Sequence, residues 1–233
     1  MARKPSKRYQ NAAKLVDATK SYSLAEAVKL LKDLPKGKTD ETIDIAFRLG
    51  VDPKQSDQMV RGTVALPHGS GRNVRVLVFA KGVAAEAAKA AGADIVGFEE
   101  LIKRVSEGFQ DFDVAVATPD AMGEVRKLGK VLGPRGLMPN PRTGTVTEDT
   151  AKAVKECKAG RVEFKLDKSG NVHVVAGKAS FEQAFLEANT KAVIEAIAKA
   201  RPATAKGRFV QNATLSSTYS PSIKVDVTPF LRN

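Results

Sequence analysis

The pattern of apolar residues changes twice along this chain, and each change indicates a different kind of β-sheet. Apolar and polar residues alternate over 43–49, which is the period of a strand with one buried face. The segments 74–80 and 112–117 are instead nearly continuous apolar runs, typical of parallel strands covered on both faces. Alternation returns over 162–175. We therefore expect antiparallel α+β structure at both ends of the chain and a parallel α/β unit in the middle.

In the middle of the chain, short apolar runs alternate with helical patterns. A strand-helix repeat of this kind favours a parallel sheet joined by right-handed crossover helices. The segment 129–144 is rich in Gly and Pro, which predicts a loop. Strands are predicted at 74–80, 94–97 and 112–117, and helices at 83–91, 98–109, 120–128 and 148–158.

The two ends of the chain contain clearer start and stop signals. Ser23 and Glu26 have the spacing of a capping box, which predicts that a helix begins there. Ser180 and Gln183 have the same spacing and predict the start of a long helix that ends near residue 200. The turn-rich segment 167–171 predicts a hairpin between the strands on either side of it. Further strands are predicted at 43–49, 59–66, 208–217 and 223–227.

The net charge of +12 is concentrated in the two ends. Residues 1–68 and 160–233 together hold 24 basic and 14 acidic side chains, a net charge of +10, whereas residues 69–159 hold 14 and 12. A surplus of this size repels itself in the folded state, so a polyanionic partner is expected. Nucleic acid is the first candidate. An anionic membrane surface is the second, although we find no basic amphipathic helix suited to it. A basic protein without such a partner is the remaining interpretation.

The charge and the apolar pattern change at the same two places. We therefore predict a discontinuous α+β domain, 1–68 plus 160–233, that binds RNA, and an inserted α/β domain, 69–159. Insertion at an exposed loop whose ends lie close together is a tolerated event. Two connecting strands permit hinge motion, and the predicted hinge residues are Pro67, His68, Gly69, Ala159 and Gly160.

Composition excludes several classes of protein. The single cysteine, Cys157, cannot form a disulfide within the chain. No apolar stretch approaches the roughly 20 residues that cross a bilayer. The basic start has no apolar signal-peptide core behind it, so a soluble intracellular protein is expected.

No group of residues indicates catalysis, a metal or a cofactor. His68 and His173 are the only histidines, and no paired CxxC or HxxxH motif occurs. The glycines at 69–71 and 133–136 lack the position or spacing of a nucleotide-binding loop. We therefore predict that the chain is not an enzyme. The alternative is a nucleotide-binding enzyme that uses the inserted α/β domain.

Basic and hydroxyl-bearing residues of the outer domain form the candidate RNA surface. Arg3, Lys4, Lys7 and Arg8 are predicted to form a flexible arm for phosphate contacts, although such arms also serve as solubilising tails. Folded RNA is recognised through its shape, its 2′-hydroxyl groups and its stacked bases. Lysines at turns and strand ends, and hydroxyls around one aromatic ring, suit that purpose: Lys36, Lys38, Lys165, Lys168, Ser217, Thr218, Tyr219 and Ser220.

Four motifs occur in order along the chain: SDQMVRGT at 56–63, LPHG at 66–69, GPRGLMPNP at 133–141 and GKASF at 177–181. Together they resemble signatures of the large-subunit ribosomal protein L1 family. The resemblance covers nearly the whole chain and implies a split β-α-β, ferredoxin-like outer domain with a three-layer Rossmann-like insert. It also implies binding to large-subunit ribosomal RNA, formation of the mobile stalk near the tRNA exit site, and repression of the protein's own messenger RNA. The expected protein is a cytoplasmic, ribosome-associated monomer when free.

The same resemblance implies particular RNA-binding residues. The chain departs from the family at Thr39, where many members have an aromatic residue, and at Tyr219-Ser220, where Met-Gly is usual. We predict that Tyr219 stacks or packs against RNA instead. Contacts with exit-site tRNA or a second RNA region are expected at Lys130, Arg135 and Arg142. The residues that the resemblance places on the main RNA surface are Lys38, Thr42, Lys165, Lys168, Asn212 and Thr218 to Ser220.

Overall fold

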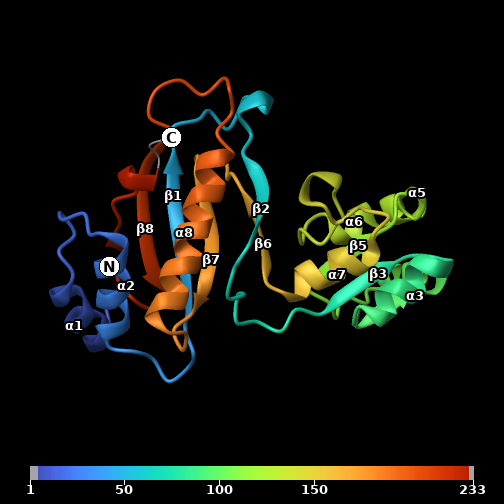
Figure 1. Cartoon of the computed structure of the whole chain (residues 1–233), viewed down its shortest axis with the longest axis horizontal. Helices are drawn as coiled ribbons and strands as arrows, with labels where there is room; N and C mark the ends of the chain where they lie inside the picture. The colour runs from blue at the N-terminus through green and yellow to red at the C-terminus, as the bar shows by residue number, and fades with distance from the viewer. Residues whose placement is uncertain (1–4, 231–233) are drawn as a thin grey trace. The chain divides into compact units, whose positions relative to one another are not determined.

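The structure, a computed structural model, describes residues 5–230, apart from the side chains of Ser56 and Arg142. The chain divides into two compact units (Figure 1). The second unit is the continuous segment Arg72–Arg161, and the first consists of the residues on both sides of it. Both borders lie within three residues of the expected domain borders.

Four strands form the antiparallel sheet of the first unit: β1 (Thr42–Leu49), β7 (Asn171–Lys178), β8 (Val210–Ser217) and β9 (Ile223–Lys224). They lie in the order β7-β1-β8-β9. Ile45, in the middle of β1, is opposite Val174 of β7 and Leu215 of β8. The alternating apolar residues of β1 are all buried, which confirms the predicted antiparallel strand with one buried face.

Two helices cover the apolar face of this sheet: α2 (Leu24–Asp33) and α8 (Gln183–Lys199). Figure 1 shows α8 lying across β1 and β7. Ser23 caps α2 with the predicted capping box, and the apolar stripe of α2 then packs into the core. Because successive strand side chains alternate, polar residues of β1 such as Arg48 point to the opposite face of the sheet.

Three predictions for the first unit are wrong. Lys7 and Arg8 do not form a flexible arm, because they lie in a helix, α1 (Lys7–Leu15), whose first turn is capped by the Ser6 hydroxyl. The predicted capping box at Ser180 does not form either, since α8 begins at Gln183 without a side-chain cap. The Ser180 hydroxyl instead donates to the Asp40 carboxylate at 2.9 Å.

The predicted hairpin around 167–171 is the third error. The two strands on either side of this turn belong to different sheets, because β6 (Arg161–Lys165) pairs with β2 (Arg61–Ala65) while β7 pairs with β1. The Asp167 carboxylate accepts hydrogen bonds from the backbone N–H groups of Ser169 and Asn171. This local turn redirects the chain from one sheet to the next.

The second unit is a three-layer α/β structure, as predicted. Its strands are parallel and lie in the order β4-β3-β5: β3 (Val76–Phe79), β4 (Ile95–Gly97) and β5 (Val114–Ala117). On one face, α3 (Gly82–Ala90) and α7 (Thr150–Lys158) pack on Val76 and Val78. On the other, four helices pack on Leu77 and Phe79: α4 (Glu99–Ser106), α5 (Met122–Val125), η2 (Arg126–Leu128) and α6 (Gly129–Leu132).

The remaining elements are single turns of 3-10 helix: η1 (Ser56–Gln58), η3 (Pro141–Thr143) and η4 (Thr228–Phe230). The helix predicted over 120–128 is divided into short pieces, α5 and η2. From residue 5 to residue 230, no helix has both the length and the apolar character that crossing a membrane requires.

Candidate nucleic-acid interface

Glu41 lies next to the start of β1 and contacts three of the predicted RNA-binding residues, Arg8, Ser217 and Tyr219. Its side chain is only 4% exposed. Its Oε1 accepts hydrogen bonds from the Arg8 guanidinium at 3.1 Å and from the Gly37 backbone N–H at 2.7 Å. Its Oε2 accepts from the Ser217 hydroxyl and from the Tyr219 backbone N–H. One buried carboxylate therefore connects α1, the turn before β1 and the end of β8.

These donors determine the ionisation of Glu41. Burial raises the pKa of this carboxyl group, but the hydrogen bonds from Ser217, Gly37 and Arg8 stabilise the charged form and outweigh the burial. The pKa of Glu41 consequently lies below its ordinary value of 4.5. The carboxylate therefore stays charged at neutral pH and retains all of its donors.

The residues that follow β8 form a hydroxyl-rich turn against the start of β1. The Thr218 N–H donates to the Thr42 carbonyl at 3.0 Å, and the Thr218 hydroxyl accepts from the Thr42 N–H at 3.1 Å. The Ser220 hydroxyl accepts from the Ser217 N–H at 2.9 Å. Among the described residues, only glycines have positive φ. Ser220 therefore needs no glycine-like backbone, although the family usually has Gly at this position.

Tyr219 projects from this turn with 55% of its surface exposed. The Arg8 guanidinium carbon lies 5.2 Å from the centroid of its ring, a cation–π geometry. Tyr9, which follows on α1, is also exposed. The two tyrosines lie on an open groove of about 370 Å³, which is lined by Pro5, Ser6, Arg8, Tyr9, Thr218, Tyr219 and Ser220. Aromatic rings, a cation and hydroxyls in one groove suit stacking on nucleotides.

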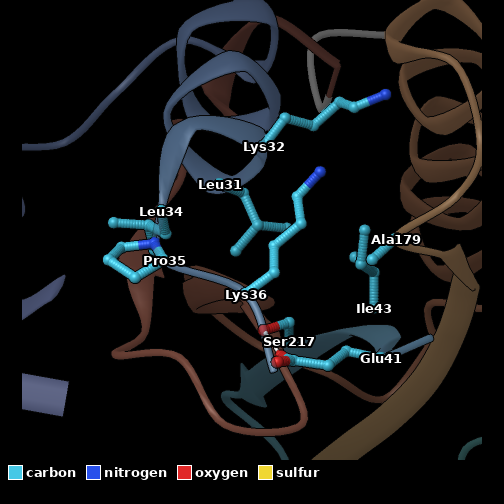
Figure 2. Close-up of a pocket in the computed structure, with 9 residues that line it drawn as sticks. All are labelled: Leu31, Lys32, Leu34, Pro35, Lys36, Glu41, Ile43, Ala179 and Ser217. Carbon is cyan, nitrogen blue, oxygen red and sulfur yellow. Dashed lines mark hydrogen bonds between the residues drawn. The ribbon is translucent and has the colours of Figure 1, made fainter. Parts of the chain in front are cut away.

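Exposed lysines surround the Glu41 end of the sheet. Lys36 and Lys38 are exposed in the turn that leads to Glu41, and Lys7 is exposed on α1. Figure 2 shows Lys36 extending away from the Glu41 carboxylate and the Ser217 hydroxyl. The cavity that these residues line measures only about 10 Å³, close to the space that one water molecule needs. This end of the sheet therefore offers a surface rather than a small-molecule pocket.

Part of the predicted RNA surface lies elsewhere in the first unit. Asn212 is opposite Arg48 in the register of β1 and β8, at the other end of β1 from Thr42. Lys168 is exposed in the turn before β7, and the carbonyl of the next residue, Ser169, accepts from the Arg48 guanidinium. Lys165 ends β6, in the two-stranded sheet. The predicted residues are therefore divided between separate parts of the unit.

The residues predicted for tRNA or a second RNA region belong to the second unit. Lys130 is exposed on α6, and Arg135 is exposed just after it. Arg142 lies in η3, but its side chain is outside the described part of the structure. Arg3 and Lys4 of the predicted arm also lie outside the described residues.

The predicted hinge residues after β2 are anchored within the first unit. The Asn189 side chain of α8 accepts from the His68 N–H at 3.1 Å and donates to the Gly69 carbonyl at 2.9 Å. Its amide also donates to the Ala176 carbonyl at 2.9 Å. The His68 ring stacks on Phe185 with the ring centroids 4.1 Å apart. A hinge on this connection, which starts at Pro67, would therefore begin after Gly69.

On the return connection, the chain turns sharply after α7. Ala159 caps that helix, and Gly160 has a φ of 100°, a left-handed conformation that favours glycine. Cys157 is buried one turn earlier, and burial raises the pKa of its thiol. This cysteine is therefore a core residue rather than a nucleophile.

Sequence reasoning missed Glu41 and Arg48 as parts of the surface. A signal for Glu41 exists, because the alternation of Ile43, Ile45 and Phe47 places residue 41 on the buried side of the strand. An acidic residue in a buried position needs hydrogen-bond donors. Within residues 5–230, His, Cys, Asp and Glu side chains form no group of three or more that could hold a metal ion.

Comparison with known proteins agrees with the motifs. A profile of the family described as "Ribosomal protein L1p/L10e family" matches residues 30–221. The chain is also 56% identical over 222 residues to "Large ribosomal subunit protein uL1" of Clavibacter sepedonicus, covering 95% of this chain and 97% of that protein. These two matches span most of both units and confirm the resemblance: the chain belongs to the ribosomal protein L1p/L10e family.

Proposed function

We propose that the chain is a constituent of the large ribosomal subunit that binds large-subunit ribosomal RNA and forms the mobile stalk near the tRNA exit site. The observation that carries the proposal is the surface around Glu41, where three segments of the first unit present lysines, hydroxyls and Tyr219 together. Hydroxyls hydrogen-bond to 2′-hydroxyl groups and phosphates, and lysines neutralise phosphates. The name of the Clavibacter sepedonicus relative supports placement in the large subunit.

Membership of a ribosomal-protein family also bears on two other expectations. The family consists of ribosomal proteins rather than enzymes, so the chain is not an enzyme. A ribosomal protein is associated with cytoplasmic ribosomes, as expected. The nucleotide-binding enzyme that the inserted unit suggested is therefore not supported.

The proposal extends to two further partners. The same surface would bind a structure in the protein's own messenger RNA that resembles the ribosomal site, so that excess free protein, acting as a monomer, represses its own synthesis. Lys130, Arg135 and Arg142 of the second unit would contact exit-site tRNA or a second RNA region.

Binding of the full chain to a stalk fragment of large-subunit ribosomal RNA should depend steeply on salt. About six phosphate contacts would make log K fall against log salt with a slope of roughly −4 to −5. Replacing Lys36 and Lys38 with alanine should make this slope less negative by about 2, because each lysine neutralises about one phosphate. Titrations at several salt concentrations measure the slope. Lys191→Ala, on the exposed face of α8, is the matched control and should leave the slope unchanged. Salt-independent binding would contradict the proposal.

Tyr219→Ala should weaken binding of the same RNA fragment by about 5- to 160-fold, since stacking of a base on an aromatic ring contributes about 1–3 kcal/mol. More than half of the Tyr219 surface is exposed, so the variant should unfold at nearly the same temperature. Tyr219→Phe keeps the ring and should retain most of the affinity. Equal affinities for Tyr219→Ala and the wild type would show that the ring does not touch RNA.

A further inference from the structure

The second unit contains a cavity that the proposed RNA surface does not use. It measures about 170 Å³ and is lined by Lys81, Ala84, Phe98, Thr118, Asp120 and Ala121. Lys81 comes shortly after β3, Phe98 directly after β4, and Thr118 directly after β5. The cavity therefore lies at the carboxyl edge of the parallel sheet. With the order β4-β3-β5, the chain passes first to one side of β3 and then to the other. Open α/β sheets bind ligands at such a switch point.

Thr118 gives this cavity an unused polar group. The residue is only 9% exposed, and its hydroxyl forms no hydrogen bond with any other residue that the structure describes. Its backbone is already occupied, because its N–H donates to the Phe79 carbonyl and its own carbonyl accepts from Ala121. Within residues 5–230 no fully buried side-chain N or O atom lacks a partner, so this hydroxyl contacts solvent and is available to bond to a ligand in the cavity.

The start of α3 adds donors for an anion. No side chain caps this helix, and free N–H groups at a helix start attract negative charge. Gly82 has a φ of 54°, and a Cβ there would meet no atom within 4 Å, so its backbone lies open to a ligand. The Lys81 ammonium lies 3.9 Å from the centroid of the Phe98 ring. Its ion pair with Glu99, at 3.5 Å, is exposed on both sides and therefore weak enough for an anion to replace it.

We propose that this cavity binds a nucleotide by its phosphate and ribose. The phosphate would lie between Lys81 and the start of α3, and the ribose hydroxyls would donate to the exposed Asp120 carboxylate. The Thr118 hydroxyl would bond to the sugar or phosphate. A volume of 170 Å³ corresponds to about six waters at about 30 Å³ each, which suits a ribose phosphate with its base at the rim beside Phe98. A free nucleotide and the 5′-phosphorylated end of an RNA share this chemistry.

The test is a titration of the isotope-labelled full chain with AMP, followed by NMR. AMP should shift the backbone amide signals of Gly82 and Thr118. Lys81→Ala should weaken AMP binding at least tenfold, whereas Lys89→Ala, exposed near the other end of α3, should not change it. Asp120→Asn should reduce the preference for AMP over 2′-deoxy-AMP, because the 2′-hydroxyl then loses a charged acceptor.

A short 5′-phosphorylated oligoribonucleotide distinguishes the two sources. Tighter binding than AMP at the same amides indicates an RNA end, and weaker binding indicates a free nucleotide. The inference is overturned if AMP leaves the Gly82 and Thr118 signals in place, or if Lys81→Ala binds AMP as the wild type does. Because the cavity lies in the second unit, Lys81→Ala should bind the stalk RNA fragment normally, so this inference and the proposed function can fail independently.

Discussion

Glu41→Ala should lower the free energy of unfolding by about 2–4 kcal/mol and weaken binding of the stalk RNA fragment more than any single lysine substitution. The substitution removes the acceptor for four donors, among them the Arg8 guanidinium and the Ser217 hydroxyl. Hydrogen bonds to a charged group contribute more than neutral ones, and donors left without a partner are costly. The turn that presents Tyr219 would also lose its anchor. Denaturant unfolding and RNA titration measure the two effects.

The pH dependence of this effect follows from the pKa of Glu41. Its value in the folded protein lies below the ordinary 4.5, so the carboxylate stabilises the fold at pH values above 4.5. This contribution is lost as the pH falls through the folded-state pKa. The stability difference between the wild type and Glu41→Ala should therefore shrink in acid. Asp33→Ala, which removes an exposed acidic side chain at the end of α2, is the control and should change the stability little. If the stability difference between the wild type and Glu41→Ala grew below pH 4.5, the lowered pKa of Glu41 would be contradicted.

Asn189→Leu should destabilise the protein by about 2–5 kcal/mol. Asn189 is fully buried, and its side chain bonds to three backbone groups, at His68, Gly69 and Ala176. Leucine has a similar volume but leaves these groups without that partner, at about 1–3 kcal/mol for a buried group. Thermal unfolding measures the loss, and limited proteolysis should show faster cleavage after β2, where the anchor is removed.

The control for Asn189→Leu is its neighbour Thr190→Val. Thr190 is equally buried, but the one bond of its hydroxyl among the described residues is to the Leu186 carbonyl within α8. That carbonyl also lies within the backbone ladder of the helix, so a loss of about 1 kcal/mol is expected. If both variants lose the same stability, then the anchoring bonds to the segment after β2 contribute nothing beyond helix packing.

Features that depend on neighbouring residues could be predicted from the sequence. Ile43, Ile45 and Phe47 occupy every second position because one face of β1 is buried. The capping box at Ser23 forms between residues that are only three positions apart. The continuous strands of the second unit likewise show that both faces are covered. These patterns were sufficient for the fold class and for the two kinds of sheet.

Features that depend on distant partners could not be predicted. Ser180 has the spacing of a helix cap, but its hydroxyl donates instead to the carboxylate of Asp40, which is far away in the sequence. The strands around 167–171 resemble a hairpin, yet β6 finds its partner in β2. In the same way, the sequence shows that Lys7 and Arg8 are basic. It does not show that Arg8 is held in place by a hydrogen bond to Glu41, because that bond forms only in the folded chain.

The place of β1 in its sheet has a consequence for synthesis. A chain made from its N-terminus completes β1 at Leu49, but both neighbours of that strand, β7 and β8, begin only at Asn171 and Val210. When synthesis reaches Arg161, all of the continuous second unit exists and can fold, as domains do during translation. The surface around Glu41 cannot form before Tyr219 has been added. A nascent chain therefore cannot occupy RNA through this surface until its translation is almost finished.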